Sequence, residues 1–361
     1  MIRPMLDARA LNRALLSRQF LLERTDRGVT DVVDAVVGLQ AQAPLAPYVG
    51  LWSRIHGFIP DDLAAPLEGR GLVRATLMRG TVHLVTADDA LRLRPLTEPA
   101  IVRGFRGGFS GRLTPEQSEE VLRVGRDWLL EAPRTRAELR ERFGERWPDR
   151  DADAMAYAVS YLLPTVQPTP RGVWGRQGRA ELALLTSWLG RELDASPSID
   201  DVVLRYLAAF GPATVKDAQT WSGLTGLREV LERLRPSLRV FASEAGDDLY
   251  DLPDAPRPDP ETPAPPRFLP EYDNVLFSHH DRSRIVDPGR RIPLPPGPGG
   301  RAGTFLVDGR FAGTWRLDGE ELRVTPFGAV GKTEAAEVEA EGLRLLAFLG
   351  SPQGRVKLEV R

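Results

Sequence analysis

One pattern repeats along this chain and constrains its fold more than any other feature: three short helices followed by a β-hairpin. In the first copy, apolar residues recur at helical spacing, and two runs rich in β-forming residues come next. The expected helices are residues 7–23, 31–40 and 61–68, and the expected strands are residues 72–78 and 81–86. This order of elements is typical of a winged-helix unit, which we predict in residues 1–112.

The same order of elements recurs twice further along the chain. In residues 113–196, Thr114 before Pro115 is typical of a helix start, because threonine caps free N–H groups and proline fits the first turn. Residues 197–253 supply a third copy, and the copies share a pattern rather than letters. The expected elements are a helix opened at 114, helices 134–143 and 152–163 and hairpin 165–174, then helix 200–209, turn and helix 211–221, helix 226–234 and strands 238–242 and 248–252.

Beyond residue 253 the chain becomes rich in proline and then in β-forming residues. Residues 253–270 contain eight prolines and predict a stiff, extended connector. Asp-Gly pairs between alternating runs predict consecutive hairpins. The expected features are Asp308-Gly309, Asp318-Gly319, a mobile loop at 293–300, a helix at 332–349 and a strand at 356–360. Residues 254–361 thus form a connector and a β-rich region with one helix.

Composition excludes several classes of protein and site. The chain has no cysteine, which excludes disulfides, thiol nucleophiles and thiolate metal sites. No apolar run reaches the roughly 18 residues of a membrane helix, and no secretory signal precedes the first helix, so a cytoplasmic location without a membrane partner is expected. Only three lysines could form a Schiff base, at positions 216, 332 and 357.

Gln40-Ala41-Gln42 is the most informative short motif. Each amide offers one acceptor and two donors without charge, so the pair could hold a water or a polar ligand edge. Pro44 pushes Ala43 out of the helical region, so we expect the helix to end near Gln40 and both amides to converge. A helix cap or a hydrogen bond within the core is the other interpretation that the local sequence allows.

The first expected hairpin carries a second cluster of polar residues. Arg74, Arg79, Thr81 and His83 would place cations and donors where a winged helix can contact a phosphate backbone. A solvated turn with one satisfied histidine is the alternative. A glycine-rich stretch, residues 104–111, lacks the context of a phosphate loop and is interpreted as a flexible, cationic loop.

A third cluster lies in residues 268–282, where two of the four histidines stand together. Adjacent residues rarely aim at one ion, so a metal site is disfavoured, and contact with DNA or support of a site is preferred. The polar members are Asp273, Asn274, His279, His280, Asp281 and Arg282.

Five segments, in this order, resemble the AlkZ/YcaQ-type winged-helix DNA glycosylases. They are Leu11-Asn-Arg-Ala14, Gly38-Leu-Gln-Ala-Gln42, Pro47-Tyr-Val-Gly-Leu-Trp-Ser-Arg54, residues 73–86, and residues 269–274 with 279–282. The resemblance implies an α+β fold, with three tandem winged-helix units and a C-terminal β-rich region forming a C-shaped DNA-binding scaffold. It also implies removal of alkylated bases, including N7 adducts of guanine and interstrand crosslinks.

Within that resemblance, Gln40 and Gln42 match the catalytic glutamine–apolar–glutamine motif of the AlkZ-like branch. Tyr48 and the polar residues of the second and third clusters are expected to bind DNA or support the site. The expected protein is a monomeric, monofunctional glycosylase that acts on double-stranded DNA containing alkylated bases and needs no cofactor or metal. A winged-helix DNA-binding protein or transcription regulator without chemistry is the alternative, and a protein-binding scaffold is a third.

Overall fold

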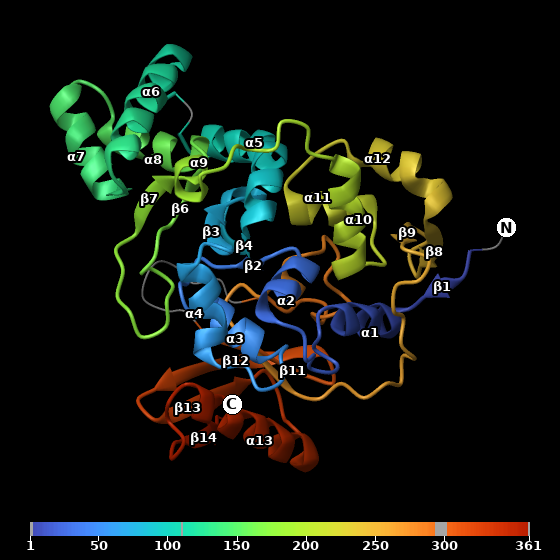
Figure 1. Ribbon diagram of the computed structural model, residues 1–361. Coiled ribbons are helices and arrows are strands. Elements are labelled where there is room, and N and C mark those ends of the chain that lie inside the picture. Colours follow the sequence, from blue (N-terminus) through green and yellow to red (C-terminus); the bar gives the residue numbers. More distant parts are fainter. Residues whose placement is uncertain (1–2, 110, 293–301, 360–361) are drawn as a thin grey trace.

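The computed structural model describes residues 3–109, 111–292 and 302–359, and it contains helices arranged around three β-sheets (Figure 1). The mixed helix-and-sheet composition predicted from the sequence is confirmed. The assignment of three winged-helix units and the C-shape stay predictions. The first region contains β1 (Met5–Leu6), α1 (Ala8–Arg18), α2 (Val29–Ala35), β2 (Leu39–Gln40), α3 (Ala46–Trp52), α4 (Pro60–Glu68), β3 (Leu72–Thr76), the 3-10 turn η1 (Met78–Gly80), β4 (Val82–Thr86) and α5 (Ala87–Phe109).

The second helix is shorter than the sequence suggested, and this matters for the site. It ends at Ala35, not near Gln40, because Val37 and Gly38 adopt left-handed φ angles of 54° and 85°. Glycine is needed at position 38, since a Cβ there would lie 2.5 Å from Cγ1 of Val85. The turn sends the chain into β2, which pairs antiparallel with β4.

The glycine-rich stretch after the first hairpin also differs in structure from the loop that the sequence predicted. Residues 104–109 are helical and form the last turns of the 23-residue α5, not a loop. Helical hydrogen bonding overrides the low propensity of glycine here, and Phe105 anchors this end in a core shared with Phe143.

The second region has its own hydrophobic core and begins as predicted. Thr114 and Thr135 cap their helices, each with a reciprocal contact from Gln117 or Glu138. The predicted hairpin at 165–174 is wrong in its second strand, because the chain loops outward before it returns at residue 181. The elements are α6 (Pro115–Glu131), β5 (Arg134–Thr135), α7 (Arg136–Arg146), α8 (Ala152–Leu162), β6 (Thr165–Val166), β7 (Glu181–Leu184) and α9 (Leu185–Leu189).

Strands of the first two regions form one six-stranded sheet. Its order is β2-β4-β3-β6-β7-β5, and Ala75 of β3 pairs with Val166 of β6. Two hairpins predicted as separate wings therefore share one sheet, and the segment with the glutamine pair lies at its edge.

The third region follows the predicted elements closely. Ser198 and Thr214 cap its first two helices, and the predicted hairpin pairs as expected. The N-terminal β1 adds to this hairpin in parallel, which gives the order β1-β8-β9. The elements are α10 (Ile199–Phe210), α11 (Val215–Ser222), α12 (Leu227–Leu234), η2 (Arg235–Ser237), β8 (Arg239–Ser243) and β9 (Asp248–Asp251).

The proline-rich connector runs along α1 and is fixed to it. Side chains of Arg9 and Arg13 donate to the carbonyl oxygens of Pro260 and Thr262, at 2.8 and 2.7 Å. Arginine suits this task because a proline-rich segment offers carbonyl acceptors but few N–H donors.

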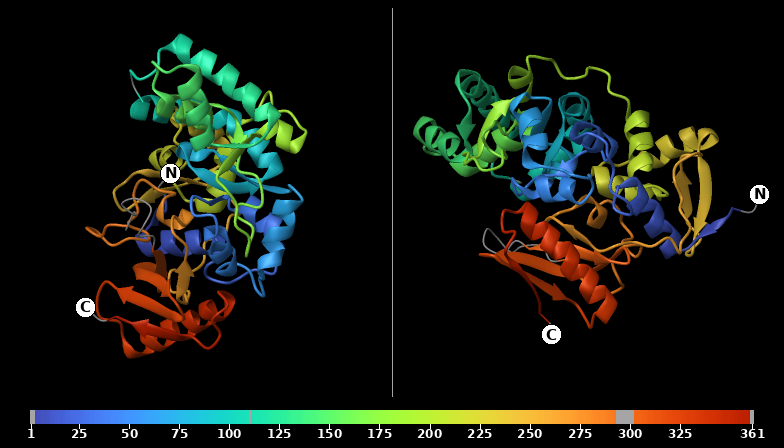
Figure 2. Two further views of the ribbon diagram at one scale, coloured as in Figure 1. Left: turned by 90° about the vertical axis from the view of Figure 1, so that its left-hand side faces the viewer. Right: turned by 60° about the horizontal axis from the view of Figure 1, so that its bottom comes forward.

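The C-terminal region forms a five-stranded sheet in the order β10-β11-β12-β13-β14, with a helix across it (Figure 2). Both Asp-Gly hairpins are confirmed. Its core is shared with α3, since Trp52 and Phe348 stack with ring centroids 5.9 Å apart. The predicted loop at 293–300 lies outside the described residues. The elements are β10 (Arg267–Leu269), η3 (Asn274–Leu276), β11 (Gly303–Val307), β12 (Arg310–Asp318), β13 (Glu321–Pro326), α13 (Lys332–Phe348) and β14 (Arg355–Leu358).

Candidate active site

The two glutamine amides meet, as the sequence predicted. Gln40 ends β2, and its Nε2 donates to Oε1 of Gln42 at 2.6 Å. Extended backbone at this point places both side chains on one face. Gln40 is buried, at 8% exposure, whereas Gln42 is exposed. The pair therefore has an inner member held by protein and an outer member that a ligand can reach.

Arg79 contacts the inner glutamine directly. Its Nη2 donates to Oε1 of Gln40 at 2.9 Å, and its Nη1 donates to the carbonyl oxygen of Trp221 in α11. Burial, and then the nearby Arg282, lower the pKa of Arg79 to about 10, so it stays protonated at neutral pH. The arginine expected to bind a phosphate backbone thus bridges Gln40 and the third region.

Asn274 holds the backbone of the glutamine segment from the other side. Its Nδ2 donates to the carbonyl oxygen of Gly38 at 2.6 Å, and its Oδ1 lies 3.4 Å from the amide nitrogen of Gln40. Asp273, the preceding residue, places it by capping η3. Both carboxylate oxygens of Asp273 accept from the guanidinium of Arg54, at 2.8 and 2.9 Å, and both side chains are fully buried.

His83 lies opposite Gln40 in the sheet but is neutral. The two residues are partners in the β2–β4 register. Burial, and then the charge of Arg79, lower the pKa of His83 to about 3. Its Nδ1 lies 3.0 Å from the carbonyl oxygen of Thr81, whose hydroxyl donates to Met78. A neutral, buried imidazole supports the strand, and it brings no positive charge to the DNA backbone at neutral pH.

Arg74 and Tyr48 lie in the interior behind the pair. Arg74 donates from Nη2 to the carbonyl oxygen of Ala41 at 2.7 Å, and burial lowers its pKa to about 9. The Tyr48 hydroxyl donates to the carbonyl oxygen of Gly172 and accepts from the amide of Trp174, both at 3.0 Å. These two residues are placed to support the site rather than to touch DNA.

The C-terminal cluster is divided between interior and surface. His279 is buried between Ser278 and the carbonyl oxygen of Phe210, and burial lowers its pKa to about 3. His280, Asp281 and Arg282 are exposed, and Asp281 accepts from Ser283. Within residues 3–109, 111–292 and 302–359, no three His, Cys, Asp or Glu side chains are grouped so as to hold a metal.

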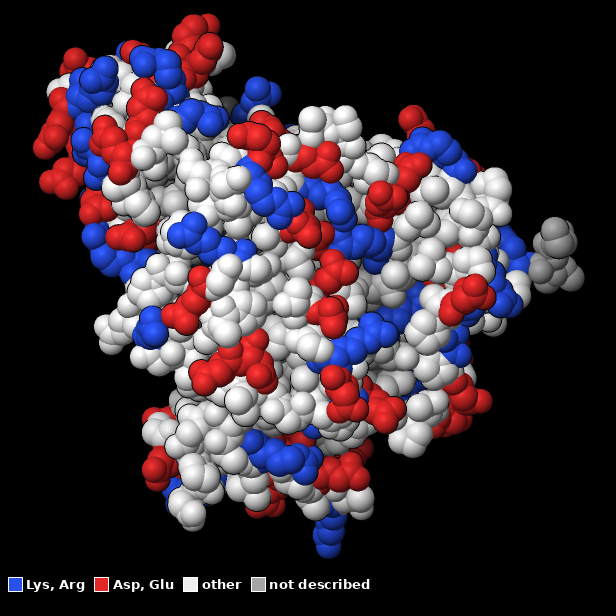
Figure 3. Space-filling model, viewed as in Figure 1, with Lys and Arg blue, Asp and Glu red and all other residues white. Residues whose placement is uncertain are grey.

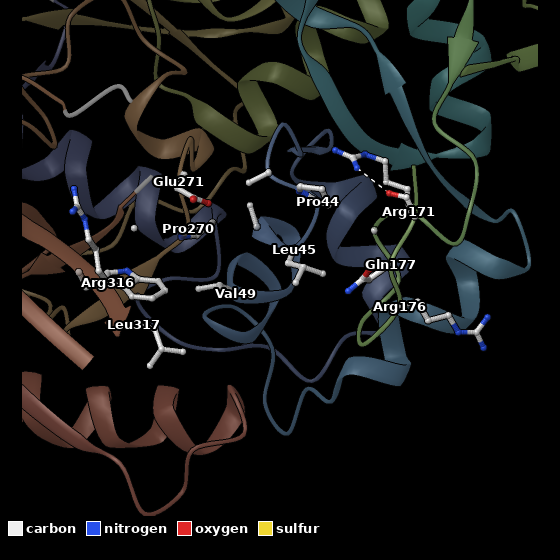
Figure 4. A pocket seen from close by; sticks show the side chains of 16 residues that line it. Pro44, Leu45, Val49, Arg171, Arg176, Gln177, Pro270, Glu271, Arg316 and Leu317 are labelled. Atoms are coloured by element: carbon white, nitrogen blue, oxygen red, sulfur yellow. Dashed lines mark hydrogen bonds between the residues drawn. The ribbon is translucent and has the colours of Figure 1, made fainter. Parts of the chain in front are cut away.

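Two cavities flank the glutamine segment. One of about 490 Å³ has Gln42 in its wall, opposite residues of the second region. Its charged members, Arg136, Arg140 and Asp153, were not singled out in the sequence, where they look like ordinary surface charges of capped helices. A second cavity, of about 690 Å³, begins at Ala43 and extends to the C-terminal sheet (Figure 4).

The surface is mixed in charge. Acidic and basic side chains alternate over the face in Figure 3, which gives no support to an acidic scaffold surface there. No helix in the described part of the chain is long and apolar enough to cross a membrane.

Comparisons with known proteins agree on one family. The model of the family described as DNA glycosylase AlkZ-like matches residues 33–348. The chain is 26% identical to an "Interstrand DNA cross-link repair glycosylase" of Streptomyces sahachiroi, over 96% of each chain. Its fold is similar to the solved structure of Streptomyces sahachiroi DNA glycosylase AlkZ, with a TM-score of 0.76 at 21% identity, over 98% of this chain and 100% of that one. Because the family model spans most of its length, this chain belongs to the AlkZ-like DNA glycosylases.

Proposed function

We propose that this protein hydrolyses the N-glycosidic bond of N7-alkylated purines in duplex DNA, and that interstrand crosslinks at N7 of guanine are among its substrates. The observation that carries the proposal is the convergence of the Gln40 and Gln42 amides, one held inside and one reachable at a cavity wall. The name of the Streptomyces sahachiroi relative supports an interstrand crosslink as a substrate. The protein acts as a monomer, on cytoplasmic DNA, without a cofactor.

The chemistry of the lesion explains why two neutral amides are enough. Alkylation at N7 makes the purine cationic, so the base departs as a neutral molecule when the C1′–N9 bond breaks and its electrons move to the base. Strong general-acid catalysis is not required. The protein must place a water and tolerate the positive sugar that develops, for which the phosphates of the DNA supply negative charge.

The hydrogen bonds of the pair leave acceptor capacity for that water. A carbonyl oxygen has two lone pairs, and Oε1 of Gln40 and Oε1 of Gln42 each accept one hydrogen bond from the protein. A water that donates one hydrogen to each oxygen turns its own lone pair outward, toward C1′. As its oxygen bonds to C1′, the excess proton passes to solvent.

The two carboxylates considered from the sequence have other partners. Asp273 is neutralised by Arg54, and Asp281 lies on an exposed turn with Ser283. We therefore assign stabilisation of the sugar cation to the DNA and not to these residues. A crosslinked base cannot leave the duplex freely, so the reaction takes place with the lesion presented to the exposed edge of Gln42.

Single-turnover excision of N7-methylguanine from duplex DNA tests the proposal. In Gln40→Ala/Gln42→Ala the rate should fall by on the order of 10²–10⁴-fold with little loss of DNA affinity. Gln177→Ala is the matched control, because this exposed glutamine lines the neighbouring cavity and should leave the rate unchanged. Wild-type excision by the double variant would refute the assignment, as would a complex with DNA trapped by borohydride, which indicates a lyase.

A DNA-binding protein without chemistry is the alternative. It should bind intact DNA of a particular sequence, commonly as a dimer on paired half-sites. Excision by the purified wild-type protein, together with a monomeric mass in solution, separates the two.

A further inference from the structure

We propose that Arg79 is a positioning residue for the glutamine pair: its guanidinium decides which end of the Gln40 amide faces Gln42. This inference rests on the proposed function. It replaces the expectation that Arg79 binds a backbone phosphate.

The amide of a glutamine side chain is nearly symmetric in shape. Rotation of the amide by 180° exchanges oxygen and nitrogen with little change in shape, so packing alone does not fix the orientation. A guanidinium has five N–H donors and no acceptor. The end of Gln40 that meets Arg79 must therefore be the oxygen, as the 2.9 Å contact shows.

The orientation of the Gln40 amide then fixes the orientation of the Gln42 amide. With Oε1 of Gln40 toward Arg79, Nε2 faces Gln42, which must offer its oxygen in return, and it does so at 2.6 Å. Both oxygens thereby keep one free lone pair. Without Arg79, both amides can rotate together, and Oε1 of Gln40 would accept from Nε2 of Gln42. The two positions now held by oxygens would then be held by nitrogens, so a water at the same place would meet N–H donors instead of acceptors.

The guanidinium is itself firmly placed. Arg79 is half-buried and has a left-handed φ of 56°, which costs a non-glycine residue free energy and persists only where the surroundings impose it. The carbonyl oxygen of Trp221 holds its other arm.

This arrangement also leaves Arg79 poorly suited to bind phosphate. Both terminal nitrogens donate to protein acceptors. Arg282, in contrast, is exposed to solvent. The third region, through Trp221, thus takes part in orienting a catalytic amide of the first region.

The test compares Arg79→Met and Arg79→Lys with a matched control, Arg70→Met. Arg70 also has a left-handed φ, of 62°, and also donates to a backbone carbonyl of another region, that of Trp188 at 2.8 Å, but it is exposed and does not contact the pair. Each variant is assayed for single-turnover excision at saturating DNA, for DNA affinity as a function of salt, and for its thermal unfolding midpoint.

Loss of a hydrogen bond from a charged donor predicts a single-turnover rate about 10- to 100-fold lower in Arg79→Met, with DNA affinity and its salt dependence unchanged. Arg79→Lys keeps one charged donor and should recover part of the rate. Arg70→Met should excise at the wild-type rate.

Three results would overturn the inference. A wild-type rate in Arg79→Met removes the positioning role. Weaker binding with a salt slope reduced by about 1 assigns Arg79 to a phosphate. A rate loss that follows the unfolding midpoint, and that Arg79→Lys does not relieve, makes the role merely structural. If Gln40→Ala retains full activity, the proposed function fails instead.

Discussion

Replacement of Asp273 separates its structural role from a chemical one. The side chains of Asp273 and Arg54 are both 0% exposed and are joined by two hydrogen bonds of 2.8 and 2.9 Å. In Asp273→Asn the charge of Arg54 stays buried without a counter-charge. Removing one partner of such a pair costs about 3–5 kcal/mol in the free energy of unfolding.

The upper end of this range does not apply, because Arg54 keeps a second acceptor. Its Nη1 also donates to the carbonyl oxygen of Gly50 at 2.9 Å. We therefore expect a loss of about 3 kcal/mol, a large share of the roughly 5–15 kcal/mol that stabilises a typical protein. The seven tryptophans provide a fluorescence signal for urea unfolding, in which the midpoint should fall clearly.

A double variant completes the assay. Arg54→Met/Asp273→Leu removes both charges and should recover most of the lost stability, since a buried pair replaced by apolar side chains is often neutral. Excision should recover only in part, because leucine cannot cap η3 as Asp273 does and Asn274 is then less firmly placed. The structural role of Asp273 is refuted if Asp273→Asn unfolds at the wild-type midpoint yet excises at least 100-fold more slowly. The double variant would then stay inactive, and Asp273 would act in the chemistry.

Two further predictions concern the supports of the site. Tyr48→Phe leaves the carbonyl oxygen of Gly172 and the amide of Trp174 without their hydrogen-bond partner. It should therefore lower the free energy of unfolding by about 1–3 kcal/mol, measured by urea unfolding. If the ring only packs, the substitution would leave stability unchanged. Burial holds the pKa of His279 at about 3, below its usual 6.5, so the unfolded chain takes up a proton that the folded chain does not as pH falls below about 6.5. Titration of His279 should therefore lower the free energy of unfolding by up to about 1.4 kcal/mol per pH unit between pH 6 and pH 4, in addition to the contribution of His83. His279→Asn should show a shallower decrease, and an equal slope in both proteins would contradict the assignment.

Local signals explain the parts of the fold that the sequence predicted well. Thr114 and Thr135 cap helices through atoms three residues away. The Asp308-Gly309 and Asp318-Gly319 turns join neighbouring strands. Such features depend on near neighbours in the chain, and so they can be read without knowledge of the fold.

Predictions of features that depend on contacts between distant residues were wrong or were not made. The helix before the glutamine pair ends at Ala35 because β2 must reach β4, about 45 residues further on. The segment 104–109 is helical because Phe105 packs into the core of the second region. Neither contact can be predicted from the neighbouring residues in the sequence.

The sequence by itself determined that Gln40 and Gln42 could converge, because extended backbone places alternate residues on one face. The helix ends earlier than Pro44 predicted, at Ala35, through the turn at Val37 and Gly38. Only the tertiary structure decided how the pair is oriented. Arg79 lies 39 residues from Gln40 in the chain, and Asn274 lies 234 residues from it. An amide takes its direction from the donors and acceptors around it, and the fold alone brings those together.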